Sequence, residues 1–105
     1  MHQKLEFSAL SRFEKERGLR DVGATVQLDA LDRLCRQSIV HPVDEQIATS
    51  AAKMWTALKK KGRLPSDVDV LIAATADVRG CAVATSDMDF ESLREFVEVL
   101  SWPLD

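Results

Sequence analysis

The chain has 105 residues, the size of one domain with a modest core, so we expect residues 1–105 to form a single domain. Hydrophobic residues make up 46% and charged residues 30%, and no apolar run reaches the roughly 18 residues of a membrane span, which argues against a membrane protein. The net charge of −3 argues against a protein that wraps nucleic acid by bulk attraction, although it leaves room for a local basic patch.

The amino-terminal residues and the cysteines favour a cytoplasmic protein. Met1 is followed by three polar residues and then by an amphipathic pattern, without the apolar region and cleavage site of a secretory signal. Cys35 and Cys81 lie far apart and outside any CxxC spacing. We therefore expect two reduced, buried thiols in preference to a disulfide or a zinc site, and no membrane partner.

Two amphipathic helices and a strand are expected in the first part of the chain. Apolar residues recur at helical spacing from Leu5 onward, and Gly18 is expected to end that helix. A second apolar stripe continues to Gln37, with Asp21 as its N-cap. Residues 38–43 are rich in β-branched side chains and are stopped by a proline, which predicts a short strand.

Two further helices are expected in the middle of the chain. Asp44 should cap a helix that runs to Lys61 and turns one apolar face toward the core. Lysines 59–61 crowd its last turn, where the helix dipole favours positive charge, so we prefer a solvated helix end to a nucleic-acid patch. The segment from Val70 to Val78 is almost wholly apolar, and its helix should be buried nearly all round.

The last part of the chain should alternate between strands and helix. Residues 81–85 predict a short apolar strand, and residues 86–89 form the polar turn beyond its carboxyl end. A brief helix over 90–96 and a last strand over 97–102 should follow. Together with the preceding helices, this order predicts an α/β fold that is rich in helix.

The carboxyl-terminal half concentrates acids at four positions, Asp67, Asp69, Asp87 and Asp89. Carboxylate oxygens bind hard divalent cations, and a metal at the carboxyl ends of strands can activate water against a phosphodiester. Each acid also has a structural explanation, because Ser66-x-x-Asp69 and Ser86-x-x-Asp89 have the spacing of capping boxes. The acids alone leave a metal site and a set of helix caps both open.

Several segments carry a resemblance to a known family. DVLIAATA at 69–76 is followed by Gly80, VATSDMDF at 83–90 and VEVLSW at 97–102. In this order and spacing they resemble the carboxyl-terminal half of a PIN domain, the fold of the VapC toxin ribonucleases. The likeness covers nearly the whole chain, since it extends upstream to three more segments, residues 62–66, VHPVD at 40–44 and LEFSALSR at 5–12.

This resemblance implies a helix-rich α/β fold with a short parallel sheet and the activity of a metal-dependent endoribonuclease of toxin-antitoxin type. The cofactor would be Mg²⁺ or Mn²⁺. Its ligands, and the catalytic carboxylates, would be Asp69, Asp87 and Glu6, the last on the family's glutamate-bearing helix. Asp89 would be a further ligand or a cap, and Thr85 would orient an acid. The implied partners are an RNA substrate and an antitoxin protein.

The chain departs from the family pattern at its start. Family members begin with a strand that carries an aspartate, and nothing in residues 1–5 matches that segment. We therefore expect a PIN-like sheet that is incomplete at the N-terminus and a ribonuclease impaired by the missing acid. Two explanations stay open: the chain is a shortened piece of a full toxin-like domain, or it folds in a rearranged way and completes itself as a homodimer by pairing with a second copy. The alternative is a catalytically silent PIN-like remnant that binds another protein, or its own copy, through the apolar faces around Phe13 and Trp55.

Overall fold

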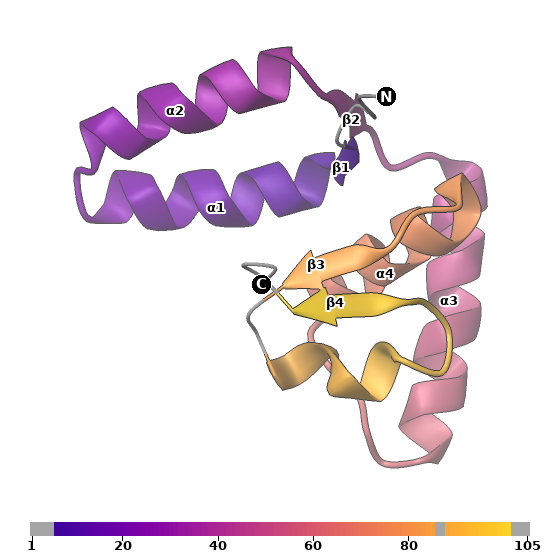
Figure 1. The fold of residues 1–105 in the computed structure, drawn as a ribbon. Helices are drawn as coiled ribbons and strands as arrows, with labels where there is room; N and C mark the ends of the chain where they lie inside the picture. Colours follow the sequence, from indigo (N-terminus) through magenta and orange to yellow (C-terminus); the bar gives the residue numbers. More distant parts are fainter. Residues whose placement is uncertain (1–5, 86–87, 102–105) are drawn as a thin grey trace. The chain divides into compact units, whose positions relative to one another are not determined.

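The computed structural model describes residues 6–85 and 88–101, with residues 88, 89 and 101 described by their backbone only (Figure 1). The chain divides into two compact units, Met1–Pro42 and Val43–Asp105, which are considered in turn. Each unit contains two long helices and one pair of parallel strands among its described residues. The short parallel sheet expected from the sequence is thus present as two separate two-stranded sheets.

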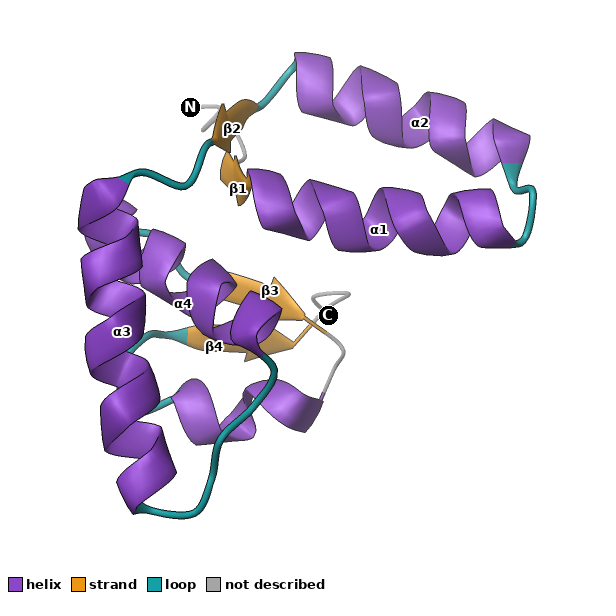
Figure 2. Cartoon of the chain, turned by 180° about the vertical axis from the view of Figure 1, so that it is seen from behind, coloured by secondary structure: helices purple, strands orange, loops and turns teal. Residues whose placement is uncertain are grey.

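The first unit is a helical hairpin closed by a pair of strands. Its elements are β1 (Glu6–Ser8), α1 (Ala9–Asp21), α2 (Thr25–Arg36) and β2 (Ile39–His41). Figures 1 and 2 show α1 and α2 side by side, and Arg12 on α1 contacts Asp32 on α2 at 3.4 Å. Strand β1 pairs in parallel with β2, with Phe7 opposite Val40.

The helix boundaries in this unit differ from those expected. The helix predicted from Leu5 onward begins only at Ala9, after Ser8, whose hydroxyl accepts a hydrogen bond from the Leu10 N–H at 3.1 Å. Gly18 does not end α1, since one glycine costs a helix only about 1 kcal/mol. The helix ends at Asp21, which therefore does not cap α2, and Gly23 takes the left-handed conformation that follows a helix end (φ 68°).

The second unit is built on two packed helices. Its elements are α3 (Glu45–Lys60), α4 (Asp67–Arg79), β3 (Val83–Thr85), the 3₁₀ helix η1 (Met88–Leu93) and β4 (Val99–Ser101). The core joins one face of α3 to α4, η1 and β4; it includes Ile47, Met54, Leu58, Val70, Ala73, Leu93 and Val99. Strand β3 pairs in parallel with β4, and Thr85 lies opposite Ser101.

Local signals place the helices of this unit correctly. Asp44 caps α3 as predicted, and its Oδ1 accepts a hydrogen bond from the Ile47 N–H at 2.9 Å. At the carboxyl-terminal end of α4, Arg79 forms an ion pair with Asp44, the N-cap residue of α3. Helix α4 is buried along most of its length, as its apolar sequence predicts. Gly80 ends it in the left-handed conformation (φ 71°), which a side chain would strain.

The remaining predictions for this part of the chain are met in outline. The helix expected over residues 90–96 is a 3₁₀ helix that begins at Met88, and the strand expected over 97–102 is described from Val99 to Ser101. The capping role considered for Ser86 lies outside the described residues. Both cysteines are free thiols, but only Cys35 is buried. None of the helices in the described ranges is long and apolar enough to cross a membrane.

Candidate active site

Asp69 occupies an unusual position at the start of α4. It lies in the first turn, where its N–H donates to the hydroxyl of the N-cap Ser66 at 3.2 Å. Its exposed fraction is only 6%, and within the described part of the chain it is the one charged residue that is buried. Burying a carboxylate is costly unless other groups stabilise its charge, and the N-terminal dipole of α4 contributes to that. Its burial at a polar helix start is what makes Asp69 a candidate functional group.

An open hollow of about 710 Å³ lies against Asp69. The loop after α3, the start of α4 and the end of η1 line it, through Arg63, Leu64, Pro65, Ser66, Asp69, Glu91 and Ser92. The hollow therefore combines two carboxylates, two hydroxyl groups and one guanidinium group. Glu91 also pairs with Arg94 on the same segment at 2.8 Å. Sequence reasoning did not single out Arg63 or Glu91, because only the packing of η1 beside α4 brings Glu91 to this place.

The two acids expected after β3 are described only in part. Asp87 lies outside the described residues, and Asp89 is placed in η1 by its backbone alone. Thr85 is half-buried at the carboxyl end of β3. Figures 1 and 2 show the carboxyl ends of β3 and β4 on the same side of this unit as the start of α4. This arrangement is compatible with the predicted grouping of Asp87 and Asp89 with Asp69, which remains a prediction.

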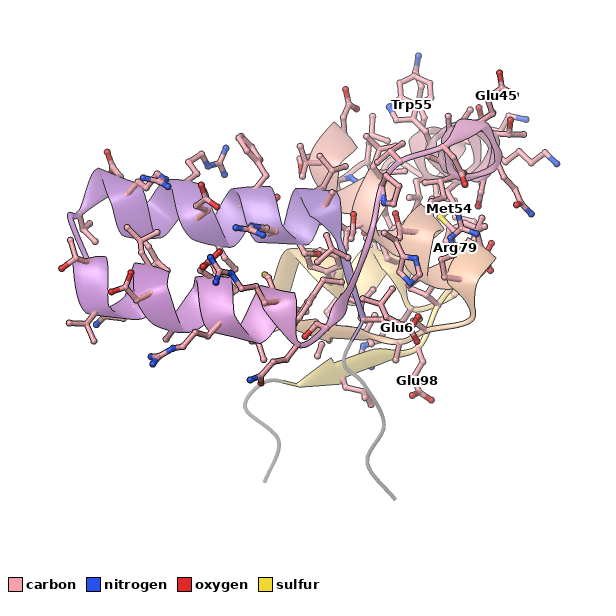
Figure 3. All side chains as sticks on the ribbon, turned by 90° about the horizontal axis from the view of Figure 1, so that it is seen from above. Glu6, Glu45, Met54, Trp55, Arg79 and Glu98 are labelled. Carbon is pink, nitrogen blue, oxygen red and sulfur yellow. The ribbon has the colours of Figure 1, made fainter. Side chains whose placement is uncertain are left out.

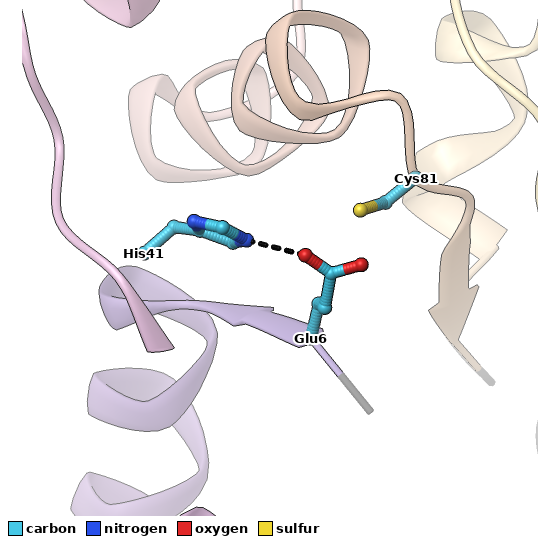
Figure 4. A group of neighbouring side chains, drawn as sticks. All are labelled: Glu6, His41 and Cys81. Carbon is cyan, nitrogen blue, oxygen red and sulfur yellow. Dashed lines mark hydrogen bonds and ion pairs between the residues drawn. The ribbon is translucent and has the colours of Figure 1, made fainter. Parts of the chain in front are cut away.

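Glu6 has a different setting from the one inferred by resemblance. It lies on strand β1 and not on a helix, because the segment around it finds a strand partner in β2. A carboxylate oxygen of Glu6 lies 2.8 Å from His41 Nε2 (Figure 4), and the two side chains are 37% and 18% exposed. Figure 3 marks Glu6 among all the described side chains. Glu6 and Asp69 belong to different units, so the binding of one ion by both carboxylates stays a prediction.

Comparison with known proteins decides the family. The PIN domain family matches residues 3–95, a range that includes most of both units. The chain belongs to the PIN domain family. The sequence-based recognition is thereby confirmed. The four helices and the short parallel sheets of the described residues confirm the helix-rich α/β fold class.

A curated relative and two solved structures are similar to this PIN domain chain. Over 55 residues it is 38% identical to Ribonuclease VapC1 of Methanocaldococcus jannaschii, a match that covers 51% of the chain and 40% of that protein. VapBC-1 of nontypeable Haemophilus influenzae has a TM-score of 0.77 at 21% identity, with 99% of this chain and 78% of that chain covered. FitAcB of Neisseria gonorrhoeae has a TM-score of 0.70 at 27% identity, with 92% and 75% covered. The chain thus spans less than half the length of the curated relative.

Proposed function

We propose that this PIN domain is a metal-dependent endoribonuclease of VapC type. The observation that carries the proposal is the buried carboxylate of Asp69 beside an open hollow that other polar side chains line. Membership of the PIN family and similarity to a relative named Ribonuclease VapC1 support the class of substrate. We further propose that residues 1–105 act as one domain, since the family match extends across both units.

The hollow offers the donor atoms that a hard divalent cation requires. Carboxylate oxygens of Asp69 and Glu91 line it, and oxygen ligands are those that Mg²⁺ and Mn²⁺ bind. When bound, such an ion supplies a Lewis acid that activates water and neutralises charge on the phosphodiester. Asp69 would hold it, with Asp87, Asp89 and Glu6 as the further ligands that we propose from the family resemblance.

Two side chains near the hollow would position Asp69 and the substrate. The hydroxyl of Ser66 fixes the first turn of α4 and so limits the positions that the Asp69 carboxylate can take. The guanidinium of Arg63 lines the same hollow and can donate two parallel hydrogen bonds to two oxygens of one substrate phosphate group. Substrate position and metal position would therefore be set by neighbouring parts of one loop and one helix start.

A cleavage assay with a matched control tests this proposal. The purified chain is incubated with a labelled RNA in Mg²⁺, in Mn²⁺ and in EDTA, and Asp69→Asn is compared with Asp67→Asn. Asp67 lies in the same first turn but is exposed. We expect cleavage by the wild type and by Asp67→Asn, and its loss in EDTA and in Asp69→Asn. Full activity in Asp69→Asn, or a wild type that is inert in both metals, would contradict the proposal.

We also propose that the chain acts in the cytoplasm with a protein partner, either an antitoxin or a second copy of itself. Helix α1 has no buried residue, and apolar side chains of the hairpin are exposed: Phe13 is 50% exposed and Val26 is 75% exposed. Phe13 lies on α1 and Val26 on α2, the two helices of the hairpin. Exposed apolar side chains that form one patch are typical of interaction surfaces. The same surface would serve the second candidate function, a silent PIN-like binding module. Light scattering after size-exclusion chromatography tests self-association, and a monomer at all concentrations would exclude the second copy.

A further inference from the structure

The charges of this acidic chain are unevenly distributed around α3. Residues 46–66 contain no Asp or Glu, yet they carry five basic side chains, whereas the whole chain has a net charge of −3. The stretch includes most of α3 and the loop that leads to α4. A continuous segment of one sign raises the local concentration of ligands of the opposite sign.

One face of α3 presents part of this charge to solvent. Thr49, Lys53, Thr56 and Lys60 are all exposed and follow one another at intervals of four, three and four residues. This spacing places them on one helix face, opposite the face that buries Ile47, Met54 and Leu58. They line a shallow, open hollow of about 710 Å³ on the outer side of the helix. We call the surface formed by these four residues the lysine face.

The lysines near this surface differ in their contacts. Lys61 pairs with Glu95, and the ammonium group of Lys59 lies 4.9 Å from the centre of the Trp55 ring. These two lysines therefore have structural explanations within the protein, as expected of a helix end. Lys53 and Lys60 take part in no ion pair with any described residue. Thr49 and Thr56 carry no charge, and the hydroxyl of Thr56 donates to the Ala52 carbonyl at 2.9 Å. Lys53 and Lys60 therefore supply the positive charge of the lysine face.

The lysine face leads toward the candidate active site. Arg63 follows Lys60 by three residues, so their Cα atoms are no more than about 11 Å apart. Between them Gly62 turns the chain in the left-handed conformation (φ 68°). Arg63 lines the hollow that contains Asp69. Basic side chains thus continue from the outer face of α3 to the carboxylates of the site.

We propose that the lysine face binds phosphate groups of the RNA strand whose cleaved bond lies at Asp69. Lys53 and Lys60 contact successive parts of the backbone, and Arg63 holds the phosphate nearest the site. This inference rests on the proposed ribonuclease function and adds the path of the substrate. RNA is the occupant that the charges favour, because a strand extending from the site carries one negative charge per nucleotide.

A binding experiment without metal tests the path separately from cleavage. A fluorescein-labelled, single-stranded RNA of twelve nucleotides is titrated with the full chain in EDTA, and the fluorescence anisotropy is recorded between about 50 and about 200 mM KCl. The variant Lys53→Gln/Lys60→Gln is compared with Lys15→Gln, a control on the exposed surface of α1. Each lost phosphate contact lowers the slope of log affinity against log salt by about 0.7.

The magnitude of that negative slope should therefore be smaller by about 1.4 in the double variant. Between the two salt concentrations its affinity for RNA should fall about sevenfold less than that of the wild type. The control should match the wild type. An unchanged slope and affinity in the double variant, or a wild type that does not bind the RNA, overturns the path. If the double variant instead changes only the oligomeric state, the face contacts protein and the proposal is wrong. If the double variant shows the smaller salt dependence but the wild type cleaves no RNA, the result supports RNA binding at the lysine face and refutes only the proposed ribonuclease activity.

Discussion

Replacing Asp69 by Asn separates a metal ligand from a helix cap. The change keeps the volume of the side chain and removes one charged oxygen. Ser66 still caps α4 through its own hydroxyl, so the metal-free variant keeps this cap and loses the interaction of the Asp69 charge with the helix dipole. That interaction is worth about 0.3–1 kcal/mol, which corresponds to a fall in Tm of about 1–8 °C for a domain of this size.

Added metal should then distinguish the two roles. At a free Mn²⁺ concentration one hundred times its Kd, a metal site in the folded state stabilises the wild type by about 2.7 kcal/mol, or about 10–20 °C in Tm. Asp69→Asn should lose this gain. Asp67→Asn, in the same first turn but exposed, should keep it while losing a similar amount of dipole energy. Thermal melts with and without MnCl₂, together with calorimetric titration, provide the measurement.

The result that would refute the reasoning is specific. If Mn²⁺ raises the Tm of Asp69→Asn as much as that of the wild type, Asp69 is not a ligand. If Mn²⁺ raises neither Tm and the calorimeter detects no heat of binding, the acids at the start of α4 are helix caps. A fall in Tm well beyond about 8 °C in Asp69→Asn alone would show that the carboxylate supports the fold through further contacts.

Two further predictions concern the second unit. Leu58 is fully buried, so Leu58→Ala should lower the free energy of unfolding by about 2–5 kcal/mol in urea titrations, whereas Leu64→Ala, at a position 41% exposed, should cost far less; equal losses would show that Leu58 is not in the core. The Ile47 N–H and the Arg79 charge lower the pKa of Asp44 below its usual 3.8, so the stabilisation it provides is complete above that pH and is lost as the pH falls through the lowered value. The stability difference between wild type and Asp44→Asn should therefore shrink in acid, and a difference that stays constant from pH 7 to pH 2 would contradict this assignment.

The sequence by itself determined the helices of the second unit and the family. Asp44 and Ser66 cap α3 and α4 through hydrogen bonds to residues three positions away, and Gly80 ends α4 within one turn. Such signals act over a few residues, so they can be seen without knowledge of the fold. The motif around Asp69 likewise lies within one segment, and the PIN match confirms the inference drawn from it.

Only the tertiary structure decided the setting of Glu6 and the composition of the hollow. The segment 5–12 has the periodicity of a helix, yet Glu6–Ser8 is a strand because it pairs with Ile39–His41, more than thirty residues away. Glu91 joins Asp69 because η1 packs beside α4, and neither segment indicates the other in the sequence. Pairing between distant segments depends on which surfaces the folded chain brings together, and periodicity within one segment carries no information about its partner.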